Sequence, residues 1–138
     1  RDYKVTGVQT CALPISYFIR RAEELKLRDK LVVIVQSEMG RTPNYNNGNG
    51  KDHWSIGSAM FLGPGIKGNR VIGATDEKQF AVPVAPQTLA IDKEKGIRMR
   101  PEHIHEALRN FAGIGEHTLA KKFPLGVKPG ESLQKLWG

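Results

Sequence analysis

The chain has 138 residues, of which 39% are hydrophobic, and its 21 basic and 14 acidic side chains give a formal net charge of +7. This length fits one domain, or a piece of one, with a hydrophobic core of its own. No apolar run approaches the roughly 18 residues that a membrane-spanning helix needs. The basic side chains are scattered, without the interleaved aromatic residues of an RNA-binding or single-strand-binding surface. The composition therefore excludes a membrane span, and we do not expect nucleic acid as a partner.

Residues 1–15 differ in character from the rest of the chain. The stretch VTGVQTCALPI, residues 5–15, has no period of 2 or 3.6 residues and contains Cys11, the single cysteine. Back-translation of these letters gives a continuous part of a common short-read sequencing adapter. Tags and fusion scars are set aside in fold reasoning, and by the same logic we interpret residues 1–15 as adapter-derived and predict that they are disordered. Residues 16–138 are then the natural protein.

The first expected elements are a helix over residues 17–30 and a strand over residues 31–35. In the helix, Phe18, Ala22 and Leu25 recur at helical spacing among charged side chains. The strand reads LVVIV, a β-branched run without polar alternation, which is typical of a strand covered on both faces in a parallel sheet. A helix followed by such a strand predicts an α/β fold.

A long loop is expected over residues 36–54, because QSEMGRTPNYNNGNGKDHW is dense in Gly, Asn and Pro. Loops of this length in compact domains are usually functional or mobile. The later elements are expected to be strands over residues 56–62 and 69–74, extended chain over 80–86, a charged turn over 92–96, helices over 101–113 and 116–122, and a docked tail with Leu133, Leu136 and Trp137.

Three candidate metal ligands lie in the long loop. Glu38 follows the carboxyl end of the expected strand, where ligands bind in open α/β sheets, and Asp52 and His53 come just before the next strand. Carboxylate and imidazole groups hold zinc, magnesium, manganese or calcium. Residue type and spacing leave open the alternative that His53 is a hydrogen-bonded surface residue.

Four motifs carry a resemblance to a known family. They are SEMGRTP at residues 37–43, NGKDHW at 49–54, GPGI at 63–66 and VIGATD at 71–76. Together they resemble the C-terminal part of the bacterial domain of unknown function 1501 family, over essentially all of residues 17–138. That family is similar to the alkaline phosphatase and sulfatase superfamily, and its full-length members often carry a twin-arginine export signal.

The resemblance implies a fold and a location. Residues 16–138 are expected to be the C-terminal fragment of one alkaline-phosphatase-like domain, an α/β sandwich with a mixed or mostly parallel sheet that is incomplete here. The missing N-terminal half is expected to supply the nucleophile and further metal ligands, and to cover a strand edge and apolar surface. A periplasmic or exported location follows from the export signal expected upstream.

The resemblance also implies roles for single residues. Glu38 takes the place of the strand-end acidic ligand and His53 that of the later histidine ligand, while Asp52 either ligates beside it or orients its ring. Arg41 either holds a phosphate or sulfate group as a bidentate donor, or it caps a helix or braces the loop. Met39 departs from the superfamily pattern, which has histidine there.

The resemblance thus implies a fragment of a metal-dependent phosphoester or sulfoester hydrolase that acts on a small anionic ester and is inactive alone. The expected cofactor is a divalent metal: zinc, magnesium, manganese or calcium. One alternative is a non-catalytic relative that binds an anion or a glycan. A third hypothesis, a basic nucleic-acid-binding domain, rests on the net charge alone.

Overall fold

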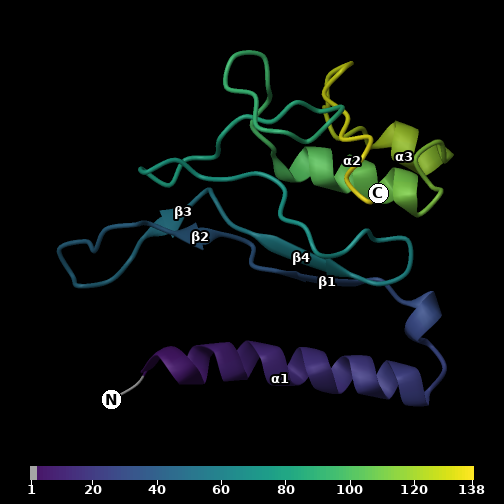
Figure 1. Cartoon of the computed structure of the whole chain (residues 1–138). Coiled ribbons are helices and arrows are strands. Elements are labelled where there is room, and N and C mark those ends of the chain that lie inside the picture. The colour runs from purple at the N-terminus through teal and green to yellow at the C-terminus, as the bar shows by residue number, and fades with distance from the viewer. Residues whose placement is uncertain (1–2) are drawn as a thin grey trace. The chain divides into compact units, whose positions relative to one another are not determined.

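The computed structural model describes the backbone of residues 3–138 and the side chains from residue 13 onward. Figure 1 shows the helices and strands along the chain, which divides into two units. Unit 1 contains the residues up to Val35 together with Ala59–Ile66, and unit 2 contains Gln36–Ser58 and Lys67–Gly138.

Unit 1 begins with the helix α1, Tyr3–Glu24. The helix expected over residues 17–30 is confirmed as far as Glu24. It ends there because Lys26 adopts a left-handed φ of 55°, through which a right-handed helix does not continue. The short 3₁₀ helix η1, Arg28–Lys30, follows.

Residues 3–15 lie within α1, whereas the sequence predicts disorder for residues 1–15. Pro14 is inside this helix, where it removes one backbone donor and disfavours the helical turn before it. Residues 1 and 2 lie outside the described residues. The adapter origin of the stretch stays a prediction.

The sheet of unit 1 has two strands, β1 (Val33–Gln36) and β4 (Ala59–Leu62). Both lie where the sequence predicts strands. The side chains of β1 are not covered on both faces, since Ile34 is 40% and Val35 is 36% exposed. The apolar run was compatible with burial, but a strand with one neighbour in a two-stranded sheet does not have the layers that would bury it.

Unit 2 contains two further short strands, β2 (Gly40–Arg41) and β3 (His53–Trp54), which pair antiparallel. The strand expected over residues 69–74 is not formed. Gly73 has a φ of +80°, which breaks a regular strand, and Val71 is 93% exposed, so it has no sheet neighbour to pack on. Isolated antiparallel bridges take the place of longer strands in this region, at Thr75–Ala81, Val84–Ile91 and Val84–Ile97.

The helices of unit 2 agree closely with the sequence. Helix α2, Pro101–Phe111, begins with its proline in the first turn, where the missing N–H costs nothing. Past its end, Gly113 takes a φ of 70°, as expected of a C-terminal stop. Helix α3, Thr118–Lys122, is shorter than expected because His117 caps it, its Nδ1 accepting from the Leu119 N–H at 3.2 Å.

The core of unit 2 forms where the C-terminal tail packs on α2. Ala107, Leu133 and Leu136 are buried together. The Trp137 Nε1–H donates to the Ala107 carbonyl at 2.9 Å, and the Trp137 ring lies 5.5 Å from that of Phe111. The predicted docking of the tail is therefore confirmed.

A buried histidine links α2 to the tail. His103 is 1% exposed, and its Nδ1 accepts from the Arg100 N–H at 3.0 Å while Nε2 lies 3.3 Å from Glu131 Oε2. Because Nδ1 accepts, Nε2 carries the proton of the neutral ring and donates to Glu131. This hydrogen bond lowers the pKa of Glu131 below its ordinary value. His103 thus ties the start of α2 to the tail.

The structure as described mixes helices with small two-stranded sheets, which agrees with an α/β assignment at that coarse level. Strands β2 and β3 pair antiparallel, and each described sheet has two strands. The larger sandwich with a mixed or mostly parallel sheet stays a prediction. Among the described helices, none combines the length and the apolar character required to cross a membrane.

Candidate functional site

The candidate site is built on a hairpin of unit 2. Strands β2 and β3 are joined by residues 42–52, called the hairpin loop below, and their register places Arg41 directly opposite His53. The Thr42 N–H donates to the Asp52 carbonyl at 3.0 Å, which makes Thr42 and Asp52 the hydrogen-bonded pair. The neighbouring pair, Arg41 and His53, is then of the non-hydrogen-bonded kind, in which facing side chains come closest. A guanidinium and an imidazole thus share one face of the hairpin.

Gly40 allows the two strands to approach. A Cβ at this position would overlap the carbonyl oxygen of Ile56 and lie 3.0 Å from its carbonyl carbon and 3.3 Å from the Trp54 oxygen. All three atoms belong to the backbone and cannot rotate away. The glycine of the SEMGRTP motif is therefore explained by close packing against the returning chain.

Asn46 holds the hairpin loop in one conformation. Its Oδ1 accepts from the N–H groups of Gly48 and Gly50, both at 3.0 Å, and its Nδ2 donates to Asp52 Oδ1 at 2.7 Å. Its own N–H donates to the Gly50 carbonyl at 2.8 Å. Sequence reasoning missed this residue, although an asparagine followed by glycines two and four positions later is a recognisable signal for such turns.

Asp52 braces the loop. Its carboxylate accepts from Asn46, and because successive side chains of a strand point to opposite faces, Asp52 and His53 face away from each other. This geometry favours neither of the two roles that the resemblance implies for Asp52, ligation beside His53 or orientation of its ring.

Arg41 also contacts the loop. One Nη1–H donates to the Lys51 carbonyl at 3.3 Å, which uses one of the five donors of the guanidinium. Lys51 in turn donates from Nζ to the Pro43 carbonyl at 3.3 Å, with that Nζ 5.3 Å from the centre of the Tyr45 ring. Loop bracing is thus observed for Arg41, and its other donors leave the role in anion binding open.

Glu38 is exposed and lies two residues before β2, in a bend where the Ser37 hydroxyl donates to the Met39 carbonyl at 2.9 Å. Across the described residues, no three His, Cys, Asp or Glu side chains gather so that they could hold a metal ion. The structure therefore brings Arg41 and His53 together but does not assemble Glu38, Asp52 and His53 into a metal site. Glu38, Asp52 and His53 by themselves do not form a set of ligands that could bind a metal ion.

Trp54 anchors the hairpin to the rest of unit 2. Its Nε1–H donates to the Gln79 carbonyl at 3.0 Å, and its ring lies 5.0 Å from that of Phe80. The same turn is closed by Asp76, whose Oδ1 accepts from the N–H groups of Lys78 and Phe80, both at 2.9 Å. The motifs NGKDHW and VIGATD thus meet in space. Trp54 of the first and Asp76 of the second have structural roles.

The comparison with known families gives one match. The chain belongs to the family described as "Protein of unknown function (DUF1501)", whose model matches residues 4–107. The match contains the whole hairpin and both motifs that meet at Trp54, and it begins inside the stretch 1–15. No curated protein and no solved structure matches the chain.

Proposed function

We propose that the hairpin of β2 and β3 is the anion-binding part of a phosphoester or sulfoester hydrolase, and that residues 16–138 are inactive without the remainder of an alkaline-phosphatase-like domain. The observation that supports this most is the register that sets Arg41 opposite His53. A guanidinium presents paired N–H donors to two oxygens of a phosphate or sulfate, and a facing imidazole adds a further donor.

The metal of this hydrolase needs donors beyond those gathered here. Glu38 and His53 are exposed and could each give one ligand, whereas the Asp52 carboxylate is used by Asn46. A bound divalent ion would polarise the ester oxygen and lower the cost of charge on the leaving group. The residues of this chain hold the anion, and the larger domain, a sandwich with a mixed or mostly parallel sheet, completes the donor set.

A second candidate is a non-catalytic protein that binds an anion or a glycan. One observation favours it: the described residues do not gather three metal donors. Both candidates use the same cationic face of the hairpin. For either, the resemblance to exported proteins supports a periplasmic or exported location as part of the proposal.

Metal content and turnover separate the two candidates. The full-length protein that contains this chain is expected to bind one or two divalent ions and to hydrolyse 4-nitrophenyl phosphate or sulfate. Glu38→Gln and His53→Ala are expected to lower turnover at least about 100-fold, because even residues that only support a metal ligand are worth about 10- to 100-fold. His105→Ala, at an exposed helix position, serves as the matched control.

A protein that binds no ion and turns over neither ester would contradict the hydrolase and support the non-catalytic candidate. Equal losses in the Glu38, His53 and His105 variants would contradict the assigned site.

A further inference from the structure

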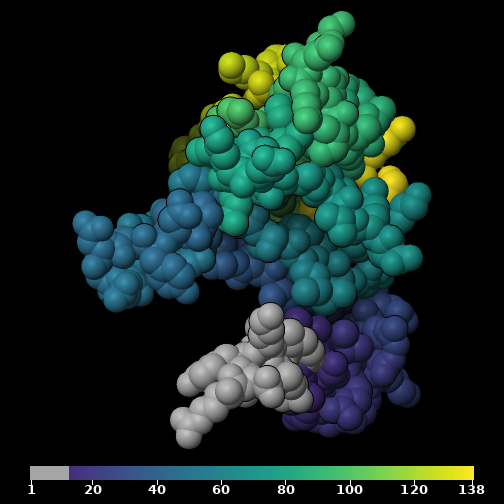
Figure 2. Space-filling model, turned by 60° about the vertical axis from the view of Figure 1, so that its left-hand side comes forward, coloured from purple at the N-terminus to yellow at the C-terminus, as the bar shows by residue number. Residues whose placement is uncertain are grey.

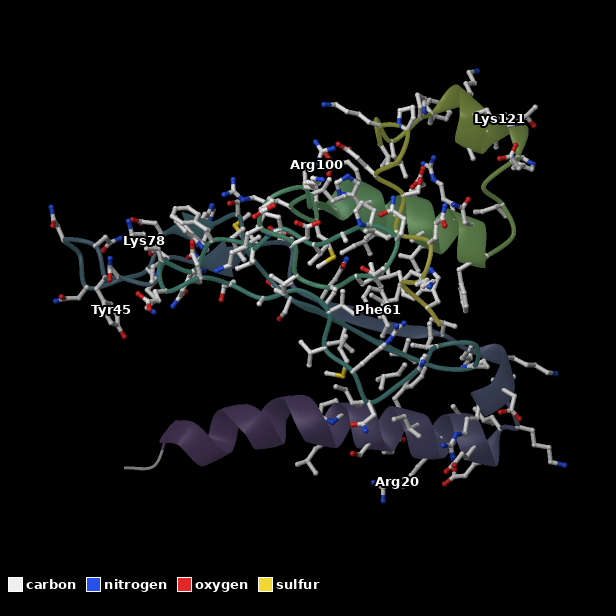
Figure 3. All side chains as sticks on the ribbon, turned by 45° about the horizontal axis from the view of Figure 1, so that its top comes forward. Arg20, Tyr45, Phe61, Lys78, Arg100 and Lys121 are labelled. Carbon is white, nitrogen blue, oxygen red and sulfur yellow. The ribbon has the colours of Figure 1, made fainter. Side chains whose placement is uncertain are left out.

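Tyr45 is an aromatic side chain that the fold does not bury. It is 72% exposed, more than any other described aromatic residue. Figure 3 shows it at the outer part of the hairpin loop, directed away from the chain, and in Figure 2 this loop projects, in blue, from the rest of unit 2. The contact of an exposed ring with water is unfavourable, and a ligand that covers the ring removes part of this free-energy cost.

The loop that carries Tyr45 is rigid enough to act as a platform. The Asn46 side chain makes three hydrogen bonds across it, and Arg41 and Lys51 each donate to a loop carbonyl. A loop held in this way loses little conformational entropy when a ligand binds. Exposure of Tyr45 is therefore a feature of an ordered surface.

The hairpin that carries Tyr45 also carries the kinds of group that recognise a charged sugar. The ring offers a flat apolar face for the C–H groups of a pyranose, and the exposed amides of Asn44, Asn47 and Asn49 offer donors and acceptors for hydroxyl groups. Lys51 Nζ lies 5.3 Å from the ring centre, and Arg41 contacts the backbone of Lys51. Ring, amides and cations all belong to one hairpin.

We propose that the hairpin binds an anionic glycan, a polysaccharide that carries sulfate or phosphate esters. Tyr45 stacks on one sugar ring, and Lys51 and Arg41 contact the ester group of the same chain. The inference rests on the proposed function, because it names the class of substrate or ligand for the same hairpin. It adds Tyr45 as the residue that distinguishes a sugar ester from a free anion.

The experiment must separate stacking from the general attraction of a chain with a net charge of +7 to polyanions. The full chain is titrated, in EDTA and about 0.15 M salt, with dextran sulfate, dextran phosphate, neutral dextran and polyvinyl sulfate. Dextran has the rings without the charge, and polyvinyl sulfate has the charge without the rings. The two charged dextrans show which ester the hairpin prefers.

We expect the charged dextrans to bind more tightly than neutral dextran or polyvinyl sulfate. Tyr45→Ala is expected to weaken the binding of charged dextran about tenfold, the upper range for an aromatic contact, and to leave polyvinyl sulfate unchanged. Tyr45→Phe retains the affinity. The matched control is Tyr17→Ala, since that tyrosine is 61% exposed on α1.

The inference is overturned if Tyr45→Ala and Tyr17→Ala have equal effects, or if polyvinyl sulfate binds as tightly as dextran sulfate. Its failure is distinguishable from that of the hydrolase, because binding in EDTA requires neither metal nor turnover. Glycan binding that depends on Tyr45, without any ester turnover, would refute the hydrolase proposal alone. Turnover of a small ester, with glycan binding unaffected by Tyr45→Ala, would refute the glycan proposal alone.

Discussion

Replacing Gly40 with alanine is expected to separate β2 from β3. The added Cβ would overlap the Ile56 carbonyl oxygen and press on the Trp54 oxygen. Relief requires a backbone shift in a hairpin whose register sets Arg41 against His53. Overpacking of this kind costs about 1–3 kcal/mol, and here the cost falls on a pair of two-residue strands. We expect large amide chemical-shift changes throughout residues 40–54 and loss of anion binding.

Gly68→Ala is the control for this substitution. A Cβ at Gly68 meets nothing within 4 Å, so its spectrum should differ from the parent only locally. A Gly40→Ala protein with unchanged shifts across residues 40–54 would show that the strands do not approach as described.

Leu133→Ala is expected to be the most destabilising change in unit 2. Leu133 is 3% exposed and packs with Ala107 and Leu136 where the tail meets α2. Truncation of a buried leucine removes its transfer free energy and leaves a cavity, together about 2–5 kcal/mol. For a chain of this size, such a loss is a large part of the free energy of unfolding. Urea denaturation followed by tryptophan fluorescence measures it.

Leu119→Ala provides the comparison, since Leu119 is 60% exposed on α3. We expect its effect on the free energy of unfolding to be within about 0.5 kcal/mol. Equal effects of the two substitutions would contradict the position of the core.

The sequence predicted the elements whose signals are local. Helix α2 is bounded by Pro101 and Gly113, which act through their own backbone preferences. Strand β1 was located by its β-branched run, but the run does not indicate what covers it, so the burial was not obtained. The strand expected over residues 69–74 has the right composition, and the positive φ of Gly73 and the exposure of Val71 show why it does not form.

The sequence pointed to residues of the hairpin but not to their arrangement. Strands of two residues show no periodicity, so the sequence predicts one loop where β2 and β3 lie. The asparagine at 46 and the glycines at 48 and 50 signal a turn, but they do not indicate which residues pair across it. The pairing of Arg41 with His53, and the use of Asp52 by Asn46, are consequences of that register.

A titration of the ¹⁵N-labelled chain with inorganic sulfate tests most directly whether the hairpin is the anion-binding surface. Our account predicts that the largest amide shift changes fall on Arg41, Lys51 and His53, and that Arg41→Gln removes them. Changes confined to other basic segments, such as Lys67 and Arg70 or Lys121 and Lys122, would place the anion elsewhere and contradict the assignment.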